Sequence, residues 1–536
     1  MGCQFRLISA VAFGASYLVS SGKIVPSWWP IAGFVANFAT LWTVQFVAWA
    51  SWAVILWPKF LSPLRGLPEP TDNSLFHGQF HKIRKLPTGV PMREWINSIP
   101  NDGLIRYLGL FNQERLVVTS HKTLAEVLVT KNYDFEKPST FQFFLGRILG
   151  YGILLVEGET HKMQRKNLLP AFAFRHVKDL YPVFWSKSQE CVQAMTDHIS
   201  QDETKSSEDK NTAVIEVGGW ASRATLDIIG VAGLGHDFRT IENPNNKLNQ
   251  TYQNMFSPSR SGKRNLEINE AARVIRATCA DLIAEKKEKR ARKEQSDVDI
   301  LSVALESGGF SDENLVDQLM TFLAAGHETT ASAMTWATYL LARHPDVQTR
   351  LRAEIRAHLP SPAGGDAAVV SSLDIDHMPY LNAVCNEVLR YFSPVPLTLR
   401  TTACDTSING QFVPKGTSVV LAPWAVNKSE SMWGPDALEF NPDRWMAKFA
   451  GDKDAASGGA KSNFAFLTFL HGPRSCIGQG FAKAEFACLL AAWAGRFEFE
   501  LNDKEELDET KIKIEDGVTA RPAKGLFVKT RVVEGW

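Results

Sequence analysis

One cysteine lies in a stretch whose spacing suits a thiolate. Cys476 belongs to the run 469–478, Phe-Leu-His-Gly-Pro-Arg-Ser-Cys-Ile-Gly, where it follows Arg474 by two residues and has a glycine on either side. Glycines allow a loop to turn tightly and to approach a flat, bulky group. The apolar segment 481–493 predicts a helix whose free N–H groups point at the sulfur and favour its thiolate form. A metal ligand, a nucleophile and a redox thiol all fit these residues, and a buried structural cysteine is the remaining alternative.

A second stretch carries an acid beside two hydroxyls. Residues 325–330 read Ala-Gly-His-Glu-Thr-Thr inside a long predicted helix. The small residues leave room on one helix face, and the Thr329 and Thr330 hydroxyls can bond back to carbonyls one turn earlier, which favours a local bulge. Glu328 and Thr329 are residue types that hold and pass protons. When it stands alone, this pattern is a weak motif, and relief of packing explains it better.

A third pattern joins two separate stretches. Glu387 and Arg390 are three residues apart on a predicted helix, which by itself is an ordinary surface pair. The run 440–445, Phe-Asn-Pro-Asp-Arg-Trp, follows about fifty residues later and supplies Arg444.

In this order, these stretches resemble the motifs of the cytochrome P-450 family. The run around Cys476 has every fixed residue of the family signature Phe-x-x-Gly-x-Arg-x-Cys-x-Gly, and residues 325–330 resemble the oxygen-activation element. The resemblance covers roughly residues 67–536. It implies haem b as cofactor, with Cys476 as the axial ligand of the haem iron and with Glu328 and Thr329 as the catalytic proton-delivering residues.

The resemblance also implies a structural role for the third pattern. Glu387, Arg390 and Arg444 would form an ion network that locks the region of the cysteine loop, without taking part in catalysis. Trp445 stands where phenylalanine is commoner in the family.

The two propionates of haem need cations or strong donors if they are buried. The resemblance assigns this role to Arg474 in the cysteine signature, to Arg400 after the run 394–399, and to Arg165. His161 replaces the tryptophan of the family pattern Trp-x-x-x-Arg. Its ring can still donate to a propionate. If it donates as imidazolium, we expect a raised pKa and a bond that weakens as the pH rises.

The implied activity is that of a monooxygenase. It inserts one oxygen atom of O2 into an organic substrate and reduces the other to water. Nothing in the chain resembles a flavin or nicotinamide domain, so electrons would come from NADPH through a separate cytochrome P-450 reductase, with cytochrome b5 as a further candidate donor. Which of Lys162, Lys166 and Lys483 would meet the reductase stays open.

The substrate class rests on the expected lining of the pocket, which is mostly apolar or small and favours a lipophilic molecule. The chain resembles microsomal enzymes of filamentous fungi, which indicates a tailoring step in secondary-metabolite biosynthesis, on a polyketide or a terpenoid. Two other functions remain: a haem-thiolate isomerase or dehydratase that needs no O2, and a non-catalytic haem sensor. The acid and hydroxyl at 328 and 329 argue against both, because neither function needs a proton relay.

The composition has equal numbers of basic and acidic residues and dispersed cysteines. The 536 residues include 58 Lys and Arg and 58 Asp and Glu, so no overall charge favours nucleic acid. Seven cysteines are scattered without paired spacing, which indicates reduced thiols in a domain that faces the cytosol.

The N-terminal region differs from the rest. No charged residue lies between Lys23 and Lys59, and the segment 31–56 is long enough to span a bilayer. The shorter apolar run 7–19 could be a second span, a re-entrant piece or a signal-like segment. Basic residues after the long span favour a cytoplasmic catalytic domain on the endoplasmic reticulum membrane. We therefore expect a membrane anchor at 1–57, a proline-rich hinge at 58–70 and the catalytic domain at 71–536.

The elements that must position these residues are mainly helical. Ser311 can cap a helix that runs to about Arg343, where His344 and Pro345 stop it. At more than 30 residues, this helix would cross the whole domain. Short β-branched stretches at 115–119, 406–412 and 417–422 predict a minor sheet. The predicted fold class is mainly α with a minor β-sheet region, as in the cytochrome P-450 fold, with an N-terminal transmembrane anchor.

Overall fold

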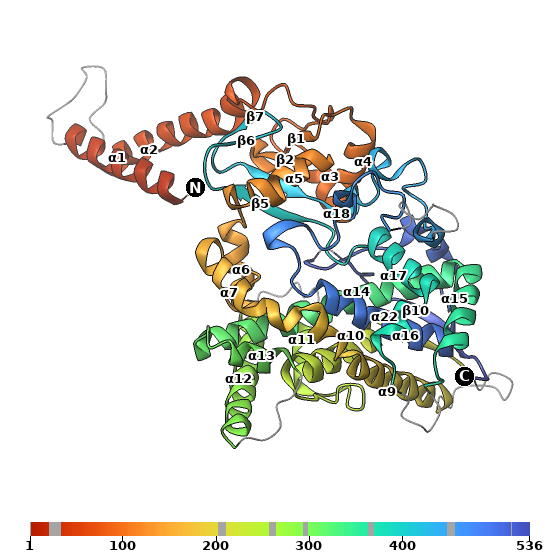
Figure 1. Ribbon diagram of the computed structural model, residues 1–536. Helices are drawn as coiled ribbons and strands as arrows, with labels where there is room; N and C mark the ends of the chain where they lie inside the picture. Colours follow the sequence, from red (N-terminus) through yellow and green to blue (C-terminus); the bar gives the residue numbers. More distant parts are fainter. Residues whose placement is uncertain are drawn as a thin grey trace.

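A computed structural model gives the fold of the chain (Figure 1). It describes residues 2–20, 34–201, 211–256, 264–292, 299–362, 369–446, 456–515 and 517–536. The helices are α1 Gly2–Ser20, α2 Phe34–Ser51, α3 Phe80–Lys85, α4 Val90–Ser98, α5 His121–Ala125, α6 Ser139–Leu149, α7 Gly158–Leu168, α8 Phe174–Lys178, α9 Tyr181–Ser200, α10 Val217–Ile228, α11 Lys247–Phe256, α12 Arg264–Ala291, α13 Ile300–Glu306, α14 Asp312–Arg343, α15 Pro345–His358, α16 Ser372–Asp376, α17 Pro379–Tyr391, α18 Pro423–Val426, α19 Glu430–Trp433 and α22 Gln479–Arg496. The strands are β1 Leu104–Leu108, β2 Glu114–Val118, β3 Phe135–Glu136, β4 Thr212–Glu216, β5 Thr398–Thr402, β6 Thr406–Ile408, β7 Gln411–Val413, β8 Ser418–Leu421, β9 Phe497–Leu501 and β10 Phe527–Val532.

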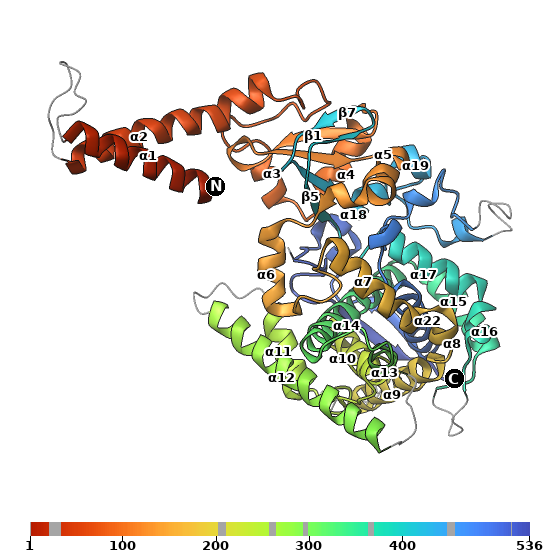
Figure 2. The same ribbon diagram turned by 60° about the vertical axis from the view of Figure 1, so that its left-hand side comes forward.

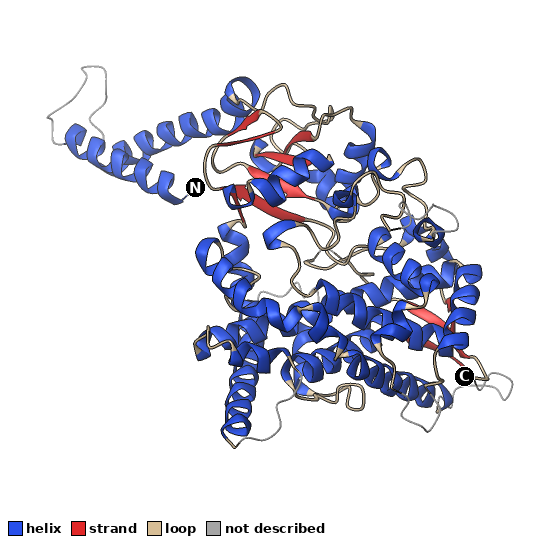
Figure 3. Cartoon of the chain, in the orientation of Figure 1, coloured by secondary structure: helices blue, strands red, loops and turns tan. Residues whose placement is uncertain are grey.

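The strands form small sheets beside a much larger helical part (Figure 3). One sheet has the order β1-β2-β8-β5-β3, in which β2 and β8 run parallel and the other neighbours run antiparallel. A second sheet has the order β4-β10-β9, and β6 pairs with β7. The predicted class, mainly α with a minor β region, is confirmed.

Two of the predicted strands are confirmed and one is wrong. The stretches 115–119 and 417–422 correspond to β2 and β8 within one residue. The stretch 406–412 is a hairpin of β6 and β7 instead of one strand. Its turn falls at Asn409 and Gly410, which have φ of 50° and 79°. An Asn-Gly pair favours such a left-handed turn, and it outweighs the β-branched residues around it.

The long helix α14 runs through the middle of the helical part, as Figure 1 shows. The Ser311 side chain accepts a hydrogen bond from the Asn314 N–H at 3.3 Å, and the helix ends at Arg343 before the proline, as predicted. Residues on all sides of this helix are buried, because α10, α12 and α22 pack around it. The bulge predicted near Thr329 is absent, because 312–343 is one continuous α-helix.

The N-terminal helices project from the rest of the protein. Figures 1 and 2 both show α1 beside α2, and the Trp42 indole N–H donates to the Ser9 hydroxyl at 3.2 Å. Helix α2 continues as a π-helical segment, Trp52–Leu61. Among the described residues, Phe34–Leu61 is the one helix long and apolar enough to cross a membrane. Residues 31–33 of the predicted span lie outside the described residues.

The end of this long helix contacts the β1–β2 region. The Arg106 guanidinium donates to the Pro58 carbonyl at 2.5 Å, and the Asn112 amide donates to the Val54 carbonyl at 2.7 Å. The predicted hinge therefore begins inside a helix that is fixed to the β1–β2 region.

Candidate active site

The loop that carries Cys476 is held in a conformation that requires glycine. Gly472 has φ of 77°, and a Cβ there would lie 2.2 Å from the Leu128 carbonyl oxygen. The Cys476 N–H donates to the Phe469 carbonyl at 2.8 Å, which closes the loop. Helix α22 begins at Gln479, three residues after the cysteine, as the sequence predicted.

The environment of the Cys476 thiol favours one of the three chemistries that the sequence left open. The side chain is exposed, yet enough protein surrounds it that burial raises its pKa, against the lowering effects of the Gly478 N–H and the Arg165 charge. A nucleophilic or redox thiol needs a lowered pKa. A metal-bound thiol is deprotonated by the metal itself, so the thiol of Cys476 suits a metal ligand.

A buried ion network stands behind this loop. The Arg390 guanidinium forms two hydrogen bonds with the Glu387 carboxylate, at 2.7 and 2.8 Å, and Arg444 Nε lies 3.2 Å from the same carboxylate. Burial alone would raise the pKa of Glu387, but the two arginines hold it below its usual value. The Trp445 indole N–H also donates to Glu387, at 2.9 Å, which a phenylalanine could not do.

One asparagine connects the ion network to the cysteine loop. The Arg390 guanidinium donates to the Asn427 carbonyl at 2.8 Å. The Asn427 side chain donates to the Thr468 hydroxyl at 2.8 Å and accepts from the Leu467 N–H at 2.7 Å. The network therefore fixes the chain just before the cysteine signature.

Several cations gather on another side of the loop, where they are buried. The side chain of Arg474 is 4% exposed, and Arg400 as a whole residue is also 4% exposed. The Lys137 side chain is 9% exposed. Among the described residues, the carboxylate paired with this group is Glu157, which lies 2.6 Å from Arg474 and 3.4 Å from Lys137. Burial, followed by the charge of Arg474, lowers the pKa of Arg400 to about 10.

This cluster has more positive than negative charge. Burial and the charges of Arg400 and Arg474 lower the pKa of Lys137 to about 8, although Glu157 acts in the opposite direction. Buried cations are stabilised when anions pair with them. The two propionates of a haem would supply the missing negative charge, so the residues present fit that group.

Arg165 occupies a different place from the other arginines. Its guanidinium donates to the Ser475 carbonyl at 2.7 Å and to the Ser475 hydroxyl at 3.2 Å. It therefore binds the main chain next to Cys476. A propionate role for Arg165 stays a prediction.

His161 is buried among these cations, with 3% of its surface exposed. Burial, followed by the charges of Lys137, Arg474 and Arg165, lowers its pKa to about 4. The raised pKa that we predicted for an imidazolium donor depends on a propionate partner, so it stays a prediction; the protein cations by themselves lower the pKa. The Nδ1 atom has no hydrogen-bond partner among the described residues, so a neutral ring remains available as a donor or acceptor.

We expect this lowered pKa to make the stability of the protein fall in acid. The pKa of His161 is near 6.5 in the unfolded chain and about 4 in the folded one. As the pH falls from 6.5 toward 4, the unfolded chain binds a proton at this ring and the folded chain does not, so the folded state loses stability. The full loss is about 3 kcal/mol. Urea denaturation of the haem-free protein between pH 4.5 and 7.5 should give a steeper pH dependence for the parent than for His161→Trp, which does not titrate. Equal slopes would mean that His161 does not titrate differently on folding.

The proposed proton-delivering residues lie on neighbouring faces of α14. The Thr329 hydroxyl donates to the Ala325 carbonyl at 2.8 Å, and Ala325 is exposed although the helix around it is buried. The Glu328 side chain turns away from that face. It accepts from the Thr519 hydroxyl at 3.0 Å and pairs with Arg521 at 3.1 Å.

The sequence reasoning missed several residues of this site. Lys137 and Glu157 come from segments without a recognisable motif. Glu485, nine residues after Cys476, is fully buried and accepts from the Thr330 hydroxyl at 3.0 Å. Burial raises its pKa well above the usual value, so it is a second buried acid, next to Thr330. Its place on α22 at the spacing of a buried helix face was the one available signal.

Comparisons with known proteins show the family of the chain. Residues 102–528 match the family described as Cytochrome P450. The chain is 47% identical over 526 residues to the cytochrome P450 monooxygenase sphH of Aspergillus fumigatus, covering 94% of each chain. It is 44% identical to the cytochrome P450 monooxygenase FUM15 of Gibberella moniliformis, covering 90% of each chain. It is 43% identical to the cytochrome P450 monooxygenase ALT8 of Alternaria alternata, covering 91% of this chain and 93% of that one. With the predicted motifs in place on a mainly helical fold, the chain belongs to the cytochrome P450 family, as one of its monooxygenases.

Proposed function

We propose that the protein is a haem-thiolate monooxygenase that inserts one oxygen atom of O2 into a lipophilic organic substrate. The observation that carries the proposal is the accessible Cys476 thiol, which lies on a glycine-closed loop beside a buried cluster of excess cations. The thiol suits an iron ligand and the cluster suits two carboxylates, which together are the needs of a haem b. When bound, this haem supplies the iron that reduces and activates O2.

The residues of the chain then have separate tasks. Cys476 would hold the iron, while Arg400, Arg474 and His161, with Lys137, would bind the propionates and exclude water from them. The Thr329 hydroxyl, on the exposed face of α14, holds a proton close to the reacting oxygen, and Glu328 replaces that proton from solvent. Glu387, Arg390 and Arg444 keep the loop in position.

Oxygen labelling tests the proposal. The purified chain, with NADPH and a fungal cytochrome P-450 reductase, should convert a member of a lipophilic library to a product with one added oxygen, and under ¹⁸O2 that atom should be labelled. Labelling from H2¹⁸O, or turnover without O2, would instead fit a hydratase or an isomerase.

Replacing Thr329 with alanine is expected to uncouple electron use from product formation. Substrate binding should be nearly unchanged, while product per NADPH falls by on the order of 100-fold and hydrogen peroxide takes its place, because the proton arrives too slowly. Thr338→Ala is the matched control. Its hydroxyl makes the same backward bond within α14, to Met334 at 3.0 Å, more than two turns away. If Thr329→Ala stays tightly coupled, Thr329 does not deliver protons.

The electron donor is inferred to be a separate NADPH–cytochrome P-450 reductase, with cytochrome b5 as a further candidate. Lys166 and Lys162 are exposed on α7, which carries His161 and Arg165 on its buried side. Lys483 is unsuited to docking, because its ammonium donates to Asn386 at 2.9 Å and burial lowers its pKa. We therefore assign docking to the α7 lysines.

We infer that residues 1–57 anchor the catalytic domain, 71–536, to the endoplasmic reticulum membrane through the hinge at 58–70, on its cytoplasmic side. Removal of residues 1–57 should release much of the protein from membranes and leave haem binding intact, because the domain has its own core. Fractionation and haem content check this. A truncated protein that folds without haem would contradict the boundary. Removal of 1–51 is the matched variant, because it keeps the Asn112–Val54 hydrogen bond.

The relatives support a fungal secondary-metabolite pathway as the setting, with this enzyme at a tailoring step on a polyketide or terpenoid. Three fungal monooxygenases share 43–47% of the sequence across nearly the whole chain. Screening of polyketides and terpenoids in the labelling assay tests this class directly.

A further inference from the structure

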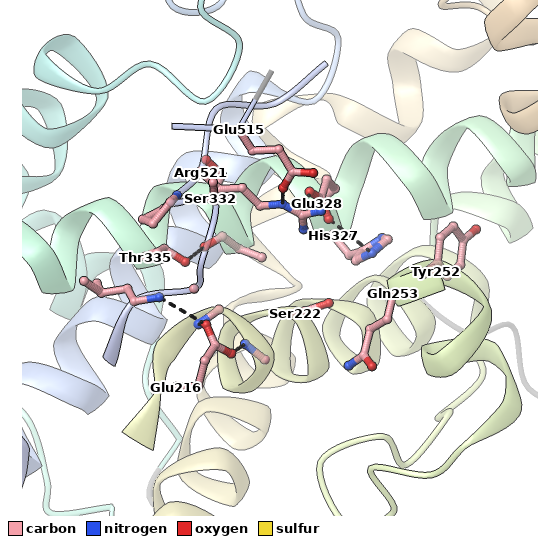
Figure 4. Close-up of a pocket in the computed structure, with 17 residues that line it drawn as sticks. Glu216, Ser222, Tyr252, Gln253, His327, Glu328, Ser332, Thr335, Glu515 and Arg521 are labelled. Atoms are coloured by element: carbon pink, nitrogen blue, oxygen red, sulfur yellow. Dashed lines mark hydrogen bonds and ion pairs between the residues drawn. The ribbon is translucent and has the colours of Figure 1, made fainter. Parts of the chain in front are cut away.

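A cavity lined by three glutamates among other residues lies on the side of α14 where Glu328 turns. It has a volume of about 350 Å³, between α10, α11, α14 and the C-terminal segment. Gln253 and Ala523 line it and are exposed, so the cavity opens to the surface. Glu328 lies at its inner end with 9% of the side chain exposed (Figure 4). We call this space the acid cavity.

One arginine is shared between two acids of the cavity. Arg521 Nη1 lies 3.1 Å from Glu328 Oε1, and Arg521 Nε donates to Glu515 Oε2 at 3.0 Å. Figure 4 shows the guanidinium between the two carboxylates. Burial disfavours the charge of Arg521, but Glu328 and Glu515 together raise its pKa. Arg521 therefore keeps a partner if either acid is neutralised.

The segment that carries Arg521 is fixed to α14. The Ser332 hydroxyl and the Trp336 indole N–H both donate to the Ala520 carbonyl, at 2.7 and 2.8 Å. The Glu515 N–H donates to the Arg521 carbonyl at 2.8 Å, which pairs the two sides of the segment. The guanidinium is thus held at a set distance from the helix turn of Glu328.

Other groups around Glu328 do not replace this cation. His327 Nε2 lies 4.0 Å from Glu328 Oε2, but burial lowers the pKa of His327 and so disfavours a charge on its ring. Thr519 donates a hydrogen bond without charge, and Glu216 at the start of α10 is a further acid in the cavity. Among the described residues that line the cavity, Arg521 supplies the positive charge.

We propose that the acid cavity is the route by which solvent protons reach Glu328, and that Arg521 is the residue that positions the Glu328 carboxylate at its inner end. A proton from solvent water binds a Glu328 carboxylate oxygen, which loses its attraction to Arg521, and Glu515 retains the guanidinium. Glu328 then gives the proton toward Thr329 and returns, charged, to Arg521. One proton enters and one leaves, so the charge of the cavity is unchanged after each cycle. The transfer of the proton from Glu328 toward Thr329 rests on the proposed monooxygenase function. The route from solvent to Glu328 does not.

Carboxyl footprinting tests the cavity without substrate or reductase. The full chain is treated with a water-soluble carbodiimide and glycinamide, and labelling of each acid is read by mass spectrometry. We expect Glu328 to be labelled slowly in the parent and severalfold faster in Arg521→Ala. Glu485, which is fully buried and does not line the cavity, should stay unlabelled in both. A Glu328 as unreactive as Glu485 in both proteins would overturn the route.

Turnover tests the positioning role. With the substrate found by the labelling assay, Arg521→Ala should raise the peroxide-to-product ratio and the solvent deuterium isotope effect severalfold, and Arg521→Lys should restore part of the coupling. Turnover driven by added hydrogen peroxide needs no such proton delivery and should match the parent. Arg531→Ala, which removes an exposed partner of Glu498 on β10, is the control. Unchanged coupling in Arg521→Ala, or an equal loss in the peroxide-driven reaction, would overturn the role. Failure of the monooxygenase proposal would appear separately, as an absence of labelled product from the parent.

Discussion

Replacing Cys476 with alanine is expected to reduce product formation to background. The variant keeps the glycines that shape the loop and the cations beside it, so the fold should survive. It loses the sulfur that would hold the iron and donate electron density to it, and no other residue of the run 469–478 carries a sulfur. Haem content per protein and product formation with NADPH and reductase are the measurements.

A second cysteine supplies the control. Cys404 is exposed and lies outside the site, so Cys404→Ala should keep parental haem content and turnover. If both Cys476→Ala and Cys404→Ala retained product formation, the iron would have another ligand and Cys476 would be a structural residue.

Replacing Glu387 with alanine is expected to have the largest effect on stability. Arg390 is fully buried and Arg444 nearly so, and both would lose their common carboxylate. Removal of one partner from a buried ion network leaves uncompensated charge and costs about 3–5 kcal/mol. The free energy of unfolding and the haem content should both fall, because the network holds the chain before the cysteine loop through Asn427.

A surface pair of the same region gives the comparison. Arg350 and Asp443 are paired at 2.7 Å with both side chains partly exposed, and Asp443 is adjacent to Arg444. Arg350→Ala should cost about 1 kcal/mol or less. A similar small cost for Glu387→Ala would mean that the buried network does not stabilise the fold.

The sequence was sufficient for the residues that share a fixed spacing. Cys476 and Arg474 belong to one short run, and the glycine at 472 is required by its positive φ and its contact with a carbonyl. The long helix was predictable because its cap at Ser311 and its stop at Pro345 are local signals. The predicted bulge was wrong, because the Thr329 and Thr330 hydroxyls bond to earlier carbonyls without breaking the helix.

Residues that act through tertiary proximity were not predictable. Lys137 and Glu157 lie in segments without a motif, and only the fold brings them to Arg474 and Arg400. Burial and the same cations lower the pKa of His161, an effect that comes from the fold and that the sequence does not reveal. The hairpin at 406–413 could have been predicted, because its Asn-Gly pair is a strong turn signal. We predicted one strand because we gave more weight to the β-branched residues around that pair.

The spectrum of the reduced carbonyl complex tests the central claim most directly. The full chain is purified, reduced with dithionite and exposed to carbon monoxide, and the position of the Soret band reports the ligand opposite the carbonyl. Ligation by the Cys476 thiolate predicts the strongly red-shifted band that a thiolate gives, at one haem per chain. A band at the position given by histidine ligation, or a protein that binds no haem, would contradict it.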